Sequence, residues 1–495
     1  MKIVNLLLFI IFVTNSNAEF TFNENCKKAY THIFNLEKDE ANYLIKVEEL
    51  YNPSNPSVIF LKSGMMFMEG VLKEDIAATT QFFELHDDFL NKAENEITED
   101  DNINWLIVES YFHAALLNFK NGNYIKGAWQ LHKSYKIAER YEDKNILSFK
   151  ITGLTESFLG TVPDEYQWVL KIFGMNGDLT SGKNKLYKLL NEASKNPDLK
   201  FILPEMVFYT AYVEGNLLNN KNTALNIINS HQEATGIFTD YIHSSLLMKS
   251  GNSDEAKKIL ERSFIKYENT DHPFPYMNYM LGMVKLQNFD YNSKKLFNNY
   301  LERYKGNHYK KSAMQKLAWI ALLKNNSKEY YEKIQEVKLI GNEETDEDRQ
   351  AMIEANNNEA PDINLLKSRL LSDGGKYTSA EKILEEMNPK NLNTKNFVEY
   401  HYRYGRIKQE QKDYDLTEFY FIKTISLQGE QNFYFAPNAA LQIAMIAEEN
   451  KDINKSEEYY KKAYSYKKHE YKNSIQQKAK AGLERIKKLK SQSEG

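Results

Sequence analysis

The chain has 495 residues, of which 27% are charged and 42% hydrophobic, and its formal net charge is −4 at pH 7. This near balance of charges excludes a global basic field for nucleic-acid binding, and the length is ample for a large buried core. Few glycines (21) and prolines (10), together with 33 tyrosines and 27 phenylalanines, favour long helices that pack through aromatic side chains.

Residues 1–18 have the parts of a secretory signal peptide. Lys2 supplies an early positive charge, the stretch from Ile3 to Val13 is almost wholly apolar, and small residues end at Ala18. The apolar run is too short to cross a bilayer, which needs about 20 such residues. We expect cleavage after Ala18, a periplasmic or extracellular protein, and no transmembrane span after cleavage; the alternative is a buried N-terminal helix.

Cys26 is the only cysteine. It cannot form an internal disulfide, so the fold is not a disulfide scaffold despite the predicted export. The residues before it, Asn23-Glu24-Asn25, are not the small and aliphatic residues that precede a lipidated cysteine. We therefore expect a poorly ordered thiol near the mature N-terminus.

Residues 19–104 show helical patterns, for example over Met65–Leu90, without clear copies of the repeat that follows. Terminal units of repeat arrays are usually atypical because they cover an apolar face that would otherwise be exposed. We expect an N-terminal helical cap over residues 19–104.

One spacing recurs over residues 105–340. The clearest copy begins at Tyr124 after a polar turn and continues with Gly127, Leu131 and Ser134. Offsets of three and four place these residues on one helical face, where small residues admit a second helix and large ones fill the gap. Further copies begin at residues 179, 222, 253, 289 and 327.

A second amphipathic stretch precedes each copy, as Glu109–Lys120 precedes the turn before Tyr124. The unit is therefore a helix-turn-helix, and such units stack because none can bury its apolar face alone. The sequence predicts an all-α solenoid of helical hairpins.

Residues 341–362 interrupt the spacing. The copies that begin at residues 327 and 377 are 50 residues apart, whereas the other steps from residue 289 onward are 37 to 39. The stretch is polar and acidic and ends in Pro361-Asp362, which is typical of a hinge. We expect an acidic linker or insertion; the alternative is the solvated start of a helix, where acids are favoured.

Residues 363–466 return to the repeat, with copies that begin at Tyr377, Tyr414 and Ile453. Residues 467–495 are basic, and apolar residues such as Ile486 fall near helical spacing. We expect a C-terminal capping helix there; the alternative is weak contact with an anionic surface.

The pattern resembles the tetratricopeptide repeat, whose unit has a small residue in helix A and small-large-small spacing in helix B. Gly405 and Ala444 stand at the small position of helix A, and Ala380 and Ser456 stand at small positions of helix B. The likeness covers roughly residues 105–466. It implies a superhelix in which helix-A residues line a concave groove.

The shorter segment 162–194 resembles the tetratricopeptide-repeat-39-like family. Pro163 leads a helix, a glycine-rich turn covers Gly174–Asp178, and Gly182 and Leu186 form a Gly-x-x-x-Leu helix. This resemblance implies a helical adaptor and not an enzyme.

Catalytic signatures with usable spacing are not found. The sequence contains no P-loop, no dinucleotide fingerprint, no Gly-x-Ser-x-Gly elbow and no His-Glu-x-x-His. The densest acidic neighbourhood of a histidine surrounds His86, but adjacent helical positions point in different directions and cannot easily close on one metal. We expect no enzyme, no cofactor and no metal.

The sequence favours an exported scaffold that binds a peptide or protein in its groove, with no nucleic-acid partner. Arginine and tyrosine suit such work as a fixed fork of donors and a rigid amphipathic ring, although exposed side chains of these types can also be ordinary surface. By resemblance, the groove residues include Glu399, Tyr402, Arg406, Gln409 and Asn438.

Two other functions are less favoured. A glycan or nutrient receptor of the SusD type would resemble this chain in its helical repeats, but such proteins carry a lipidated cysteine directly after the signal and long inserted loops. The aromatic cluster at Phe433–Phe435 suits either a carbohydrate platform or a packed corner between repeats. A hydrolase on a helical solenoid would need a separate catalytic domain, which is not visible.

Overall fold

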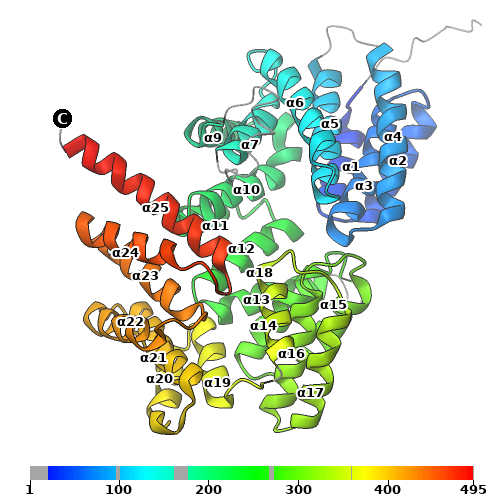
Figure 1. Cartoon of the computed structure of the whole chain (residues 1–495). Helices are drawn as coiled ribbons and strands as arrows, with labels where there is room; N and C mark the ends of the chain where they lie inside the picture. The colour runs from blue at the N-terminus through cyan, green and yellow to red at the C-terminus, as the bar shows by residue number, and fades with distance from the viewer. Residues whose placement is uncertain (1–20, 96–100, 161–176, 267–271, 358, 494–495) are drawn as a thin grey trace, which may run out of the picture. The chain divides into compact units, whose positions relative to one another are not determined.

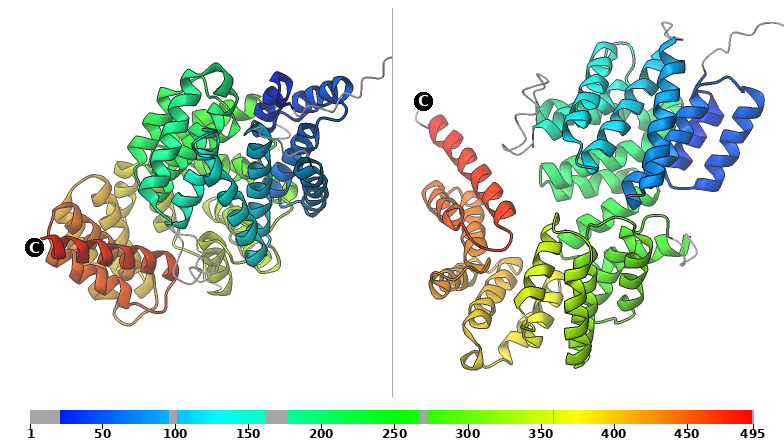
Figure 2. Two further views of the ribbon diagram at one scale, coloured as in Figure 1. Left: turned by 90° about the horizontal axis from the view of Figure 1, so that it is seen from above. Right: turned by 45° about the vertical axis from the view of Figure 1, so that its right-hand side comes forward.

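The computed structural model describes residues 21–95, 101–160, 177–266, 272–357 and 359–493. Over these residues the chain forms 24 α-helices and no β-strand, and consecutive helices pair as hairpins, which confirms the predicted fold class (Figures 1 and 2). The chain divides into two compact units, described separately below. Within the described residues, unit 1 covers 21–71, 76–160 and 177–209, and unit 2 covers 72–75 and 210–493.

The helices of the first part of the chain, up to the end of unit 1, have the following bounds. They are α1 (Glu24–Phe34), α2 (Lys38–Tyr51), α3 (Ser57–Lys73), α4 (Ile76–Asn95), α5 (Asp101–Lys120), α6 (Tyr124–Tyr141), α7 (Ser148–Leu159), α9 (Leu179–Lys195), a 3-10 helix (Pro197–Ile202) and α10 (Leu203–Tyr212).

The helices of unit 2 follow in the same manner. They are a π-helix (Val213–Leu217), α11 (Lys221–Ser230), α12 (Ile237–Lys249), α13 (Ser253–Lys266), α14 (Tyr276–Gln287), α15 (Ser293–Arg303), α16 (Lys310–Leu323), α17 (Ser327–Glu336), a 3-10 turn (Val337–Leu339), α18 (Asp346–Asn357), α19 (Ile363–Asp373), α20 (Tyr377–Glu385), a second 3-10 turn (Pro389–Asn391), α21 (Thr394–Glu410), α22 (Tyr414–Gln428), α23 (Phe435–Glu449), α24 (Ile453–Ser465) and α25 (Lys472–Ser493).

The polar turns of the repeat mark the starts of the second helices of the hairpins. Helices α6, α20, α22 and α24 begin at Tyr124, Tyr377, Tyr414 and Ile453, the first residues of the predicted copies. The carboxylate of Asp413 caps α22, and the equivalent aspartate caps α24, because each accepts a hydrogen bond from a backbone N–H of the first turn.

The small residues of the repeat lie where paired helices approach most closely. A Cβ atom added to Gly405 in α21 would lie 2.5 Å from the ring of Phe421 in α22, so no larger side chain fits without movement. In the next hairpin the hydroxyl of Ser456 donates to the carbonyl of Ala444 at 3.0 Å across the two helices. The small-large-small spacing therefore has a direct steric cause.

The N-terminal residues of the described chain are well packed, so the expectation for Cys26 was wrong. Cys26 lies in α1 with 1% of its surface exposed, and burial raises the pKa of its thiol to about 12, with a further contribution from the nearby Glu48. The carbonyl of Thr21 accepts hydrogen bonds from Asn55 at 2.8 Å and Ser57 at 3.1 Å. This buried thiol is shielded from oxidants and metal ions.

The segment proposed as an acidic linker contains a helix. Residues 346–357 form α18, which packs against α16. At the C-terminus, α25 buries Ile475, Ala479 and Ile486 against α23 and α24, and Arg485 forms two 2.7 Å hydrogen bonds to Glu448. Helix α25 thus covers the end of the hairpin array with its apolar face.

Two sequence features lie outside the described residues. They are the signal segment 1–18 and residues 162–176 of the segment that resembles the tetratricopeptide-repeat-39-like family. Within the residues described, none of the helices combines the length and apolar character that crossing a membrane requires.

Candidate functional site

A polar cavity of about 60 Å³ lies in unit 2 between α16, α18, α19, α21 and the start of α23. Its wall includes three cationic side chains, Arg369 from α19 and Lys395 and Arg403 from α21. Trp319 of α16 and Tyr434 before α23 provide aromatic surface. The cavity therefore combines the side-chain types that bind anionic or aromatic groups of a partner.

The two arginines of this cavity differ in how well they are paired. Arg403 bonds the Glu399 carboxylate at 2.7 and 3.1 Å and donates to the Tyr434 hydroxyl at 3.2 Å. Arg369 stacks over Trp319 at 5.2 Å, and its ion pair with the exposed Asp373 is long, at 3.7 Å. The ion pair of Arg369 is thus longer, and weaker, than the 2.7 Å pair of Arg403.

The acidic side chains of the cavity are used within the protein. Glu354 of α18 accepts hydrogen bonds from Trp319 at 2.9 Å, from Gln315 at 2.6 Å and from Tyr330 at 3.0 Å. Glu470 accepts the backbone N–H of Tyr434 at 2.9 Å, and burial raises the pKa of this carboxyl above its usual value.

Of the five residues proposed from the sequence, one lines this cavity and three others are linked by hydrogen bonds on α21 and α23. Glu399 lines the cavity. Arg406 donates to Gln409 at 2.9 Å, Gln409 donates to Gln442 at 2.9 Å, and Gln442 donates to Asn438 at 3.0 Å. These half-buried side chains form a chain of hydrogen bonds that links α21 to α23, the first helices of two successive hairpins.

The fifth proposed residue, Tyr402, lies in the core. Its surface is 3% exposed, and its ring lies 5.6 Å from Tyr434, 5.3 Å from Phe435 and 6.2 Å from Phe421. Tyr434 and Phe435 are buried in the same cluster. The aromatic segment at residues 433–435 is therefore a packed corner between two hairpins.

Sequence reasoning did not single out Trp319, Arg369 or Arg403. Arg403 follows Glu399 by four positions, and this i,i+4 pairing on one helical face was a usable signal. Arg369 and Trp319 lie on first helices of their hairpins, as the proposed residues do. Their meeting depends on the placement of α18 and α19, which no local pattern encodes.

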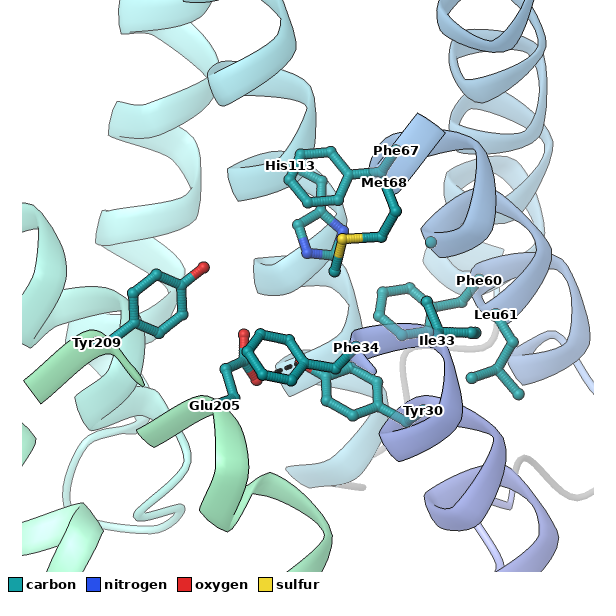
Figure 3. A pocket seen from close by; sticks show the side chains of 11 residues that line it. Tyr30, Ile33, Phe34, Phe60, Leu61, Phe67, Met68, His113, Glu205 and Tyr209 are labelled. Atoms are coloured by element: carbon teal, nitrogen blue, oxygen red, sulfur yellow. Dashed lines mark hydrogen bonds between the residues drawn. The ribbon is translucent and has the colours of Figure 1, made fainter. Parts of the chain in front are cut away.

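Unit 1 contains a second cluster of polar groups, which is fully buried. The Lys150 ammonium of α7 lies 2.7 Å from Glu109 of α5, 2.9 Å from Glu205 of α10 and 3.0 Å from the hydroxyl of Tyr30 in α1. Figure 3 shows Tyr30 and Glu205 pointing toward one another, with the hydroxyl donating to the carboxylate at 2.7 Å. All three donors of the ammonium can thus be satisfied.

The electrostatics of this cluster are unbalanced, because two carboxylates share one ammonium. Burial raises the pKa of Glu109 to about 7; the nearby Lys150 lowers it and Glu205 raises it further. Burial also holds the pKa of His113 well below its usual value, so this imidazole is neutral. The adjoining cavity of about 20 Å³ has room for about one water molecule, so the cluster holds unit 1 together and offers little space for a ligand.

His86 lies in the same unit, at the acidic neighbourhood noted in the sequence. The ring is buried, its Nδ1 lies 2.7 Å from the Ser110 hydroxyl, and burial lowers its pKa to about 4. Asp87 and Asp88 are exposed, whereas the imidazole is buried. Among the residues described, no cluster of three histidine, cysteine or acidic side chains has metal-binding geometry.

Comparison with known proteins identifies one repeat directly. Residues 437–470, which cover most of α23 and all of α24, match the tetratricopeptide repeat family. No curated protein matches the sequence of the chain.

Some solved structures of helical proteins are similar over most of the chain at low identity. Yeast Tom70 has 13% identity and a TM-score of 0.31, over 93% of this chain and 88% of that one. A human IFIT1 dimer with PPP-AAAA has 12% identity and a TM-score of 0.32, over 95% and 96%. Similarities this weak carry no inference about function. Residues 437–470 thus form a tetratricopeptide repeat, and the rest of the described chain is built from helical hairpins of the same general kind.

Proposed function

We propose that the chain is exported through residues 1–18 and serves as a non-enzymatic scaffold that binds a peptide or protein partner in unit 2. The binding surface is the helix-A face, defined as the cavity lined by Arg369, Glu399 and Arg403 together with the chain of side chains from Arg406 to Asn438. The observation that carries the proposal is this cavity, which joins first helices of successive hairpins and contains an arginine with a long ion pair.

The chemistry of the surface favours a peptide over a small apolar ligand. Arginine, glutamine and asparagine side chains offer donors and acceptors that match a peptide backbone and its polar side chains. Trp319 and Tyr434 are buried and line the cavity, so a partner side chain that enters it would meet aromatic rings. Tandem hairpins repeat such groups along one direction, which suits an extended or helical segment.

Site-specific crosslinking tests the proposal. A photoreactive amino acid is placed at Gln409 or at Asn438, and at Lys461 as the control, because Lys461 lies on the second helix of its hairpin with 65% of its side chain exposed. We expect a discrete protein adduct from the first two positions only. Equal adducts from all three, or glycan binding on an array without any protein adduct, would contradict the proposal.

Charge reversal provides an independent check. Arg406→Glu should lower capture of the crosslinked partner about tenfold, the effect of a lost charged contact at a binding surface. Lys461→Glu introduces the same change of charge on the other helix of a hairpin and should leave capture unchanged.

A further inference from the structure

Helix α18 is an extra helix in the hairpin array. Elsewhere in unit 2 the second helix of one hairpin leads to the first helix of the next, but α18 stands alone between α17 and α19. It packs along α16, whereas α19 packs mainly against α20 and α21 (Figure 1). Helix α18 therefore covers the face of α16 that would otherwise receive a neighbouring helix.

Two carboxylates hold α18 in this place. Asp348 is completely buried and accepts two backbone N–H groups at the start of α16, at 2.6 and 2.9 Å. Six positions later, Glu354 accepts hydrogen bonds from Gln315 and Trp319 of α16. These are charge-assisted hydrogen bonds, which are stronger than bonds between neutral groups.

The apolar contribution to this docking is small. The fully buried apolar residues of α18 are Ala351 and Ala355. Cavities of about 60 and 140 Å³ border the helix, and Gln350 and Glu470 line both. Each cavity has room for several water molecules. Helix α18 is thus bonded to α16 but separated by cavities from much of the wall formed by α19, α21 and the residues before α25.

That opposite wall carries more cationic than acidic side chains where it faces α18. Arg369, Lys395 and Arg403 line the cavity that Gln350 and Glu354 border. Glu354 is already engaged with α16, and Gln350 carries no charge. Glu399 and Glu470 line the same wall, and Arg403 is paired with Glu399, so α18 faces three cations and two carboxylates.

From this arrangement we propose that α18 is a built-in occupant of the groove and that the binding partner presents an acidic amphipathic helix that takes its place. The inference rests on the proposed function and adds the class of partner. Such a helix has two carboxylates six positions apart, as Asp348 and Glu354 are, and small residues between them. An acid at the position of Gln350 would add an ion pair to Arg369 that α18 lacks.

A labelled synthetic peptide with the sequence of residues 343–358 and Gln350→Glu serves as the probe. Its binding to the full chain, to Glu354→Ala and to Glu343→Ala is followed by fluorescence anisotropy. Glu354→Ala releases α18, so we expect binding at least about tenfold tighter than to the unchanged chain, because the loss of even one of its hydrogen bonds to a charged group has about that effect. Glu343 is exposed, and its variant removes the same charge as a matched control that should bind like the unchanged chain.

Hydrogen exchange of the unchanged chain keeps the test independent of any folding defect in the variant. We expect the amides of α18 to exchange faster than those of α16. Equal protection of both helices, or a folded Glu354→Ala chain that binds the peptide no better, would overturn the role of α18. Crosslinks at Gln409 and Asn438 without a gain in peptide binding would reject this inference alone. Failure of the crosslinks is the result that counts against the scaffold function itself.

Discussion

Gly375, in the turn between α19 and α20, meets the carbonyl oxygen of Gly251, in the turn between α12 and α13, so closely that an added Cβ would lie 1.7 Å from that oxygen. Both glycines have positive φ, +82° and +70°. The two turns lie 124 residues apart in the sequence, so this contact joins distant hairpins of unit 2. Glycine is needed here for conformation and for space.

Gly375→Ala should therefore destabilise unit 2 by about 2 to 4 kcal/mol, because the strain of a left-handed alanine is added to a backbone clash. The midpoint of chemical unfolding, followed by circular dichroism, measures the effect. Gly122→Ala is the control, since Gly122 also has positive φ but has no atom within 4 Å of an added Cβ. Gly122→Ala should lower the free energy of unfolding by only about 1 to 2 kcal/mol. Equal losses in the two variants would show that the turns do not meet.

The approach of α21 to α22 gives a second prediction. Gly405→Ala places a methyl group against the Phe421 ring and should cost about 1 to 3 kcal/mol from overpacking. Phe421→Leu in the same chain makes room and should recover part of this loss. A double-mutant cycle by urea unfolding measures the coupling. Strictly additive effects would contradict the steric explanation of the repeat.

The buried cluster of unit 1 predicts a dependence of stability on pH. The pKa of Glu109 is raised by burial to about 7, above its value in the unfolded chain, so the folded state holds this proton more tightly. The Glu109 proton therefore contributes about 3 kcal/mol to the free energy of unfolding. This contribution is complete below about pH 4.5 and is lost as the pH rises through 7.

Glu109→Gln removes this titration. Unfolding free energies measured between pH 5 and 8 should fall more steeply with pH in the unchanged chain than in the variant. Glu139→Gln provides a comparison, because the Glu139 carboxylate is exposed and pairs with Lys136 on the surface. A variant at Glu109 that keeps the full slope would place the titrating group elsewhere.

Export makes a prediction about the N-terminus of the mature chain. Cleavage after Ala18 leaves two residues before Thr21, whose carbonyl is held by Asn55 and Ser57. N-terminal sequencing of chain from the exported fraction of a secreting host should begin at Glu19. Ala18→Arg should prevent cleavage, because the site needs a small residue. An exported chain that still begins at Met1 would contradict the signal peptide.

Local pattern predicted much of the fold. The polar turns correctly predicted that helices begin at Tyr124, Tyr377 and Tyr414. This was possible because turn residues and helical spacing both determine structure within a single hairpin. The pairing of small and large residues followed for the same reason, as Gly405 and Phe421 show. These features depend on neighbours in the sequence.

Features that depend on contacts between distant parts of the chain were harder to predict from the sequence. Cys26 looked like an unconstrained terminal thiol, because its burial depends on the packing of α1 against α2, which the residues around it do not encode. The helix within the acidic segment was left as an alternative to a linker, since the partners of Glu354 lie on α16 and α17. Tyr402 was placed on the groove by its position in helix A, but a bulky ring there packs inward against the next hairpin.

The bond between Tyr30 and Glu205 bears on the order in which the protein folds. The two residues are 175 positions apart, whereas in an ordinary repeat array each unit contacts only its neighbours and can fold as it emerges. Helix α1 is made first, yet its buried Tyr30 hydroxyl waits for α10 to supply the Glu205 carboxylate that accepts its hydrogen bond. Unit 1 therefore closes late and as a whole, and during that interval its first helices depend on solvent or a chaperone to cover them.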